Sequence, residues 1–81
     1  MIQLGNPAAL ARIEELIREL TGGPGSYDDL MREHLEEARF YLLGCMPLEY
    51  KVTLEIARET LPAIENRDLR ERIGEFLRVQ Q

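Results

Sequence analysis

The fold is decided by residues 26–61, which read SYDDLMREHLEEARFYLLGCMPLEYKVTLEIARETL. Ser26 and the acid three positions later resemble a capping box, in which the serine side chain accepts a hydrogen bond from the first turn of a helix. Apolar residues then recur at helical spacing up to Gly44, a residue type that can adopt the left-handed conformation closing a helix. This half of the stretch predicts a helix over 27–43, with Gly44 as its left-handed terminal residue.

The second half of the stretch begins at Pro47, which can open a helix because the first turn does not use the amide hydrogen that proline lacks. Pro62 lies about four turns further on, where an interior proline breaks or kinks a helix. A helix is therefore predicted over 47–61. Only Gly44-Cys45-Met46 separates it from the preceding helix, so we expect the two to form an antiparallel hairpin.

Amphipathic segments on either side of this hairpin predict two further helices, over 7–20 and 67–79. In each segment apolar residues recur every three or four positions, and charged residues occupy the opposite side. The two-residue alternation typical of a β-strand appears nowhere for more than a few residues. The predicted fold class is all-α, a single domain over residues 1–81 with four short helices in a compact bundle around a central antiparallel helix hairpin.

The composition excludes several classes of protein. With 44% hydrophobic and 31% charged residues the chain is too apolar for intrinsic disorder, and 81 residues are too few for two domains. Its single cysteine, Cys45, excludes a disulfide framework and favours the cytoplasm. The longest apolar stretch, 40–48, is interrupted by a glycine and a proline and is too short to span a bilayer. We therefore expect an acidic cytoplasmic domain of net charge −5 with no membrane partner.

The predicted helix over 47–61 carries two apolar faces, which is one more than a helix in a simple four-helix bundle needs. At about 100° per residue, one face holds Tyr50, Leu54, Ala57 and Leu61. The other face holds Leu48, Val52 and Ile56. Either the second face pairs with another subunit, or it packs inside a compact monomer whose helices cross steeply. We favour the subunit interface, and hence a homodimer, because a chain this short gains much from pooling two cores.

These features predict a non-enzymatic protein-protein interaction or regulatory module, whose partner is a second copy or a heterologous protein. The predicted partner surface gathers aromatic and apolar side chains of the hairpin with its one histidine: Tyr27, Met31, His34, Tyr41, Tyr50 and Leu54. Tyrosine and methionine are enriched in the centres of interfaces. The same residue types also fill protein cores, so the sequence leaves both assignments open for these positions.

A small metal-binding or ligand-binding bundle is the first alternative function. Its ligands would be His34 and the nearby carboxylates of Asp29, Glu33 and Glu37. Di-iron bundles place a glutamate three residues before a histidine, twice, whereas here the order is reversed and occurs once. A structural role for His34, with its ring packed between two tyrosines, is equally consistent with the sequence. We therefore predict no metal and no cofactor, and the role of His34 stays open.

A DNA-binding regulator is the second alternative, because the tight turn before Pro47 joins two helices as in a helix-turn-helix. The segment that would enter the major groove opens with one acid and one base, and the whole chain is acidic, so we expect no nucleic-acid partner. Catalysis is not predicted either. The single histidine and the single cysteine, His34 and Cys45, are eleven residues apart, which is about 16 Å along a helix.

Overall fold

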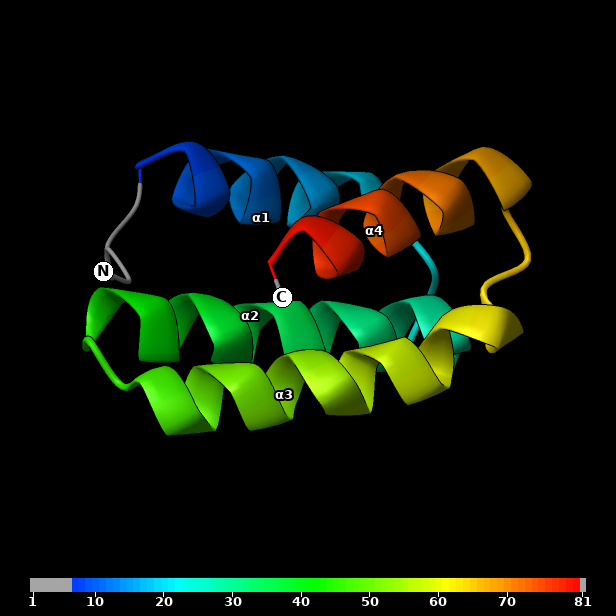
Figure 1. The fold of residues 1–81 in the computed structure, drawn as a ribbon. Coiled ribbons are helices and arrows are strands. Elements are labelled where there is room, and N and C mark those ends of the chain that lie inside the picture. The colour runs from blue at the N-terminus through cyan, green and yellow to red at the C-terminus, as the bar shows by residue number, and fades with distance from the viewer. Residues whose placement is uncertain (1–6, 81) are drawn as a thin grey trace.

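The computed structural model describes residues 7–80, and these form four α-helices and one turn of 3-10 helix (Figure 1). In chain order the elements are α1 (Pro7–Glu19), α2 (Tyr27–Leu43), α3 (Pro47–Thr60), the 3-10 turn η1 (Leu61–Ala63) and α4 (Arg67–Val79). The predicted all-α class is confirmed for this part of the chain, and each predicted helix boundary agrees within one residue.

The four helices form two layers. α2 and α3 lie side by side and antiparallel, and α1 and α4 lie together along one side of that pair (Figure 1). The bundle is elongated along the helix axes, with extents of 35 × 21 × 20 Å. The predicted central hairpin is therefore present, and it forms one complete layer of the fold.

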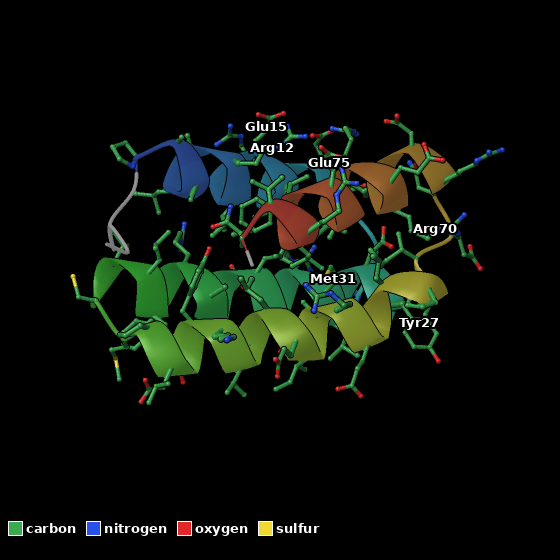
Figure 2. The ribbon with its side chains drawn as sticks, in the orientation of Figure 1. Arg12, Glu15, Tyr27, Met31, Arg70 and Glu75 are labelled. Carbon is green, nitrogen blue, oxygen red and sulfur yellow. The ribbon has the colours of Figure 1, made fainter. Side chains whose placement is uncertain are left out.

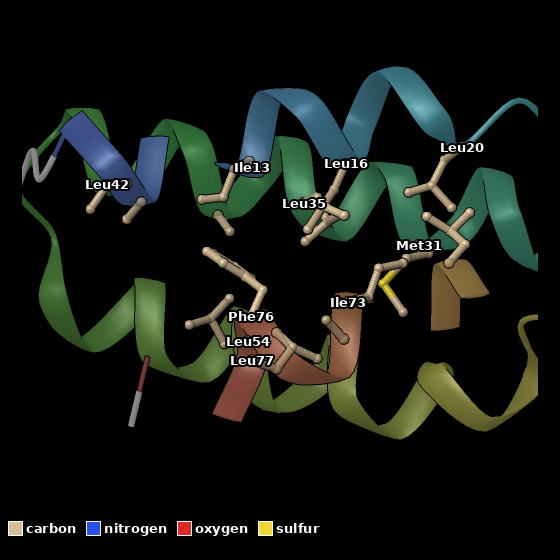
Figure 3. Close-up of a cluster of buried hydrophobic side chains, with 14 of the residues drawn as sticks. Ile13, Leu16, Leu20, Met31, Leu35, Leu42, Leu54, Ile73, Phe76 and Leu77 are labelled. Atoms are coloured by element: carbon tan, nitrogen blue, oxygen red, sulfur yellow. The ribbon is translucent and has the colours of Figure 1, made fainter. Parts of the chain in front are cut away.

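The core lies between the two layers and receives apolar side chains from all four helices (Figure 3). Its largest fully buried members are Ile13, Leu16, Leu20, Met31, Leu35, Leu42, Ile64, Ile73 and Leu77. Burying apolar surface contributes about 25 cal/mol per Å², so these side chains supply the main driving force for folding.

The connection between α1 and α2 is held by a hydrogen-bonded network as well as by the buried Leu20 side chain. The Ser26 hydroxyl oxygen accepts a bond from the Asp29 amide at 3.1 Å, which confirms the predicted helix cap. The Asp29 carboxylate accepts a bond from the Gly25 amide at 3.4 Å and pairs with Arg32. Arg32 also donates to the carbonyl oxygen of Leu20 at 2.5 Å. The network therefore links the end of α1 to the first turns of α2.

The turn between α2 and α3 corrects the prediction for Gly44. The Met46 amide donates to the Tyr41 carbonyl at 2.9 Å and the Cys45 amide donates to the Leu42 carbonyl at 3.3 Å. This pair of bonds is a Schellman motif, whose left-handed residue lies one position after the helix cap. Cys45 has a φ of 55° and Gly44 a φ of −83°. The left-handed residue is therefore Cys45, and the prediction was wrong by one position.

Replacing Cys45 with glycine is expected to stabilise the protein by about 0.5–1 kcal/mol, because glycine adopts positive φ without a steric penalty. Part of the gain is offset by the greater freedom of glycine in the unfolded chain. Urea denaturation followed by circular dichroism measures the change. Gly44→Ala is the matched control and should give no stabilisation, because its Cβ would lie 3.3 Å from the Phe40 carbonyl oxygen. A destabilised Cys45→Gly protein would contradict this account of the turn.

α4 is attached to α3 by two side-chain hydrogen bonds near its C-terminal end. The Arg58 guanidinium donates to the carbonyl oxygen of Leu77 at 3.2 Å. The Tyr50 hydroxyl lies 3.0 Å from the Oε1 atom of Gln80, to which it donates. These bonds cross between the two layers, so they fix the position of α4 along α3.

α4 is attached to α1 by an ion pair. A guanidinium nitrogen of Arg72 lies 2.5 Å from a carboxylate oxygen of Glu19, and the same guanidinium pairs with Asp68 at 3.0 Å. The hydrogen bond from Arg72 lowers the pKa of Glu19 below its usual value. The Arg72 and Glu19 side chains are each about one third exposed, so solvent weakens this ion pair and its effect on stability is small.

Candidate interaction surface

The exposed large apolar side chains of this protein are concentrated on the hairpin. Within residues 7–80 they are Tyr27, Leu30, Phe40, Leu43, Leu48, Val52, Ile56 and Val79. All except Val79 belong to α2 or α3. Scattered exposed apolar residues are ordinary, whereas their concentration on one pair of helices is typical of a binding surface.

The second apolar face of α3 lies outside the core. Leu48 is 75% exposed, Val52 is 53% exposed and Ile56 is 44% exposed. The physical reason is that α3 occupies a corner of the bundle, with α2 on one side and α4 on another, so its remaining side has no neighbour within the described chain. Of the two arrangements that the sequence left open, packing of this face inside a compact monomer is therefore not found within residues 7–80.

The contacts between helices show which side of the hairpin these residues occupy. The Nε2 atom of His34 lies 3.3 Å from the Thr60 hydroxyl, where α2 faces α3. Arg39 of α2 pairs with Glu14 of α1, and Arg58 of α3 bonds to α4. Successive residues of a helix turn by about 100°, which places Leu30, Val52 and Ile56 toward the α2–α3 contact, on the side away from α1 and α4, whereas Phe40 and Leu43 point away from α3.

We call this side the hairpin face. Its apolar members are Tyr27, Leu30, Tyr41, Leu48, Val52 and Ile56, and its charged members are Glu33, Glu37, Glu49 and Glu59. Figure 2 shows the ring of Tyr27 projecting away from α1 and α4 at one end of the hairpin. The hairpin face is therefore an apolar stripe with an acidic rim.

The structure divides the residues predicted for the partner surface between the hairpin face and the core. Tyr27 is 59% exposed, and His34 and Tyr41 are half-buried beside α3. Met31, Tyr50 and Leu54 lie in the core instead, because their side chains point between the two layers. These three residues therefore do not line an exposed surface.

Several members of the hairpin face were not among the predicted site residues. The sequence showed that Leu48, Val52 and Ile56 form a second apolar face of α3. They were nevertheless not included among the predicted partner-surface residues. Leu30 gave no signal of its own, since a leucine in an amphipathic helix is usually a core residue. Its 39% exposure follows from the packing of α2 between α1 and α3.

The metal-binding alternative depends on a cluster that the fold does not assemble. Among the described residues, no three histidine, cysteine or acidic side chains come together closely enough to hold a metal ion. The Nε2 atom of His34 lies beside the Thr60 hydroxyl rather than beside a carboxylate. Asp29 is on another side of α2, where it pairs with Arg32. The predicted ligands therefore do not converge around His34.

A small cavity of about 280 Å³ lies between the start of α1 and the end of α4. It is lined by Ala8, Ala9, Arg12, Glu75, Phe76, Val79 and Gln80. Arg12 pairs with Glu15, and Glu75 pairs with Arg78, so the charged residues of the lining already have partners on their own helices (Figure 2). Pockets for small molecules are usually larger and have converging polar groups. This cavity therefore gives little support to a ligand site.

The hairpin geometry also differs from that of a helix-turn-helix. In that motif the two helices meet at about 90–120°, whereas α2 and α3 run antiparallel along their length. His34 and Cys45 stay apart as predicted, because α2 is continuous from Tyr27 to Leu43 and Cys45 lies beyond its end. None of the described helices is sufficiently long and apolar to cross a membrane.

Comparisons with known proteins give no relative for this chain: no family model matches it, and no curated protein or solved structure is significantly similar to it.

Proposed function

We propose that this protein is a non-enzymatic protein-protein interaction module that works through the hairpin face. The observation that carries the proposal is the exposure of Leu48, Val52 and Ile56, an apolar stripe that residues 7–80 of one chain leave uncovered. Exposed apolar patches on a folded domain usually mark a site where another molecule binds. The exposed, unpaired thiol of Cys45 is consistent with a reducing compartment such as the cytoplasm.

Self-association is the simplest interaction that such a face can make. The acidic residues at the rim of the hairpin face determine how the strength of self-association depends on salt. Two hairpin faces packed together would bring Glu37 and Glu49 of one copy near the acids of the other. Like charges repel over a distance of about 10 Å at 0.1 M salt and about 3 Å at 1 M. Self-association through this face should therefore be weak in low salt and stronger in high salt.

Light scattering across a dilution series tests this expectation. The average mass of the wild type should rise from monomer toward dimer with protein concentration, and the association constant should increase at least about fivefold between 0.05 M and 1 M salt. Val52→Gln/Ile56→Gln should remain monomeric, because it removes the apolar centre of the hairpin face while keeping the helix. Both positions are exposed, so circular dichroism should show an unchanged fold.

The matched control is Leu43→Gln/Val79→Gln, which removes two exposed apolar side chains that lie outside the hairpin face. It should associate as the wild type does. Loss of association in the control pair would show that general surface hydrophobicity, rather than the hairpin face, holds two copies together. A wild type that is monomeric at every salt concentration would contradict self-association.

A further inference from the structure

The charges on the hairpin face have one sign. Glu33, Glu37, Glu49 and Glu59 are all exposed and lie beside the apolar stripe or at its end. Four acids without a base on one face account for most of a net charge of −5 carried by the whole chain. The face therefore has a chemical character that the rest of the surface, with its alternating acids and arginines, lacks.

The arginines of the hairpin are directed elsewhere by their contacts, and its one lysine lies on the same side of α3 as one of them. Arg32 donates to the carbonyl oxygen of Leu20, just after the end of α1, and Arg39 pairs with Glu14 of α1. Arg58 donates to Leu77 of α4, and Lys51 lies seven residues before Arg58, on the same side of α3. Residues seven apart share one side of a helix. The single-sign character of the hairpin face is therefore a consequence of the bundle geometry.

This charge pattern discriminates among possible occupants. A second copy would present the same acids and be repelled, as described above. Nucleic acids and anionic membrane surfaces carry negative phosphates, so an acidic face disfavours both. A partner with lysines and arginines would complement the charge of the hairpin face. A partner helix with an apolar stripe would complement its shape if it lay along the hairpin. This combination is the amphipathic-helix mode of peptide recognition.

We propose that the hairpin face binds one basic amphipathic helix of a partner protein. This inference rests on the proposed function and specifies the partner's chemistry. The partner's apolar stripe covers Leu30, Val52 and Ile56, and its lysines or arginines lie over the acidic rim. α3 has 14 residues, which at 1.5 Å each gives a length of about 21 Å, so a partner helix of about four turns spans the face.

Two synthetic peptides of equal length test the proposal by fluorescence anisotropy. The first is a labelled amphipathic helix of leucines on one side and lysines on the other, and the second has every lysine replaced by glutamate. The lysine peptide should bind the full-length protein one to one with a micromolar dissociation constant. The glutamate peptide should bind at least about tenfold more weakly than the lysine peptide. Raising the salt concentration to about 0.5 M should lower the affinity of the lysine peptide for the protein at least about tenfold.

Two pairs of glutamine substitutions distinguish binding at the hairpin face from a general attraction of the lysine peptide to an acidic protein. Glu37→Gln/Glu49→Gln should lower the affinity for the lysine peptide about fivefold to tenfold, because it removes half of the acidic rim. The control Glu65→Gln/Glu71→Gln removes the same charge at exposed positions outside the hairpin, and should leave the affinity within about twofold. Val52→Gln/Ile56→Gln should lower the affinity at least about tenfold.

The outcomes distinguish this inference from the function on which it rests. Equal effects of the two glutamine pairs, or equal binding of the two peptides, would overturn the basic-helix proposal. If the lysine peptide does not bind while the wild type self-associates through Val52 and Ile56, the interaction module stands and the basic partner is wrong. If the protein neither binds the peptide nor self-associates, both proposals fail.

Discussion

Replacing Leu35 with alanine is expected to lower the free energy of unfolding by about 2–5 kcal/mol. Leu35 lies in the middle of α2 and is fully buried between the two layers (Figure 3). Its truncation removes apolar surface from the core and leaves a cavity that the surrounding helices fill only in part. Chains of this length are usually stable by about 4–12 kcal/mol, so the variant should lose a large share of its stability.

Leu48→Ala provides the matched control for this prediction, because it makes the same chemical change on a side chain that is 75% exposed. Its effect on the free energy of unfolding should be within about 0.5 kcal/mol. Urea denaturation monitored by circular dichroism measures both variants under one set of conditions. Similar losses for the two would show that the second apolar face of α3 is buried in solution, which would remove the basis of the proposed interaction surface.

The helix boundaries could be predicted accurately because they depend on local chemistry. Ser26 caps α2 through its own side chain, and Pro47 starts α3 through its fixed backbone angle. The left-handed residue of the turn could not be placed in the same way. Its position depends on which carbonyls of α2 accept the last two bonds, and these favour Cys45 although the neighbouring glycine suits positive φ better.

The site could be predicted only in part, because burial depends on where neighbouring helices lie. α2 packs against α1 as well as α3, and Tyr27 shares a side of α2 with the buried Met31 and Ala38. Tyr27 is nevertheless 59% exposed, because it is the first residue of the helix. The sequence does show that α3 has two apolar stripes. It does not show which stripe faces the core, and this is why Tyr50 and Leu54 were assigned to a partner surface while Val52 was not.

Alkaline pH is expected to destabilise the protein through Tyr50. Burial raises the pKa of Tyr50 from 10.0 to about 12. The unfolded chain therefore releases this proton near pH 10, while the folded chain holds it until about pH 12. Because the folded-state pKa is the higher one, the stability linked to this group is fully present below pH 10 and is lost as pH rises toward 12. The difference corresponds to about 2–3 kcal/mol.

Tyr50→Phe isolates this contribution, since phenylalanine keeps the buried ring and removes the ionisable hydroxyl. The variant should be less stable by about 1 kcal/mol at neutral pH, because it loses the hydrogen bond to Gln80. Between pH 10 and 12 its free energy of unfolding should fall less than that of the wild type, so the two curves should converge or cross. Tyr27→Phe changes a ring that is 59% exposed and should reproduce the wild-type curve. Parallel curves for Tyr50→Phe and the wild type would place the cause of any alkaline instability elsewhere, and would contradict the burial of the Tyr50 hydroxyl between α3 and α4.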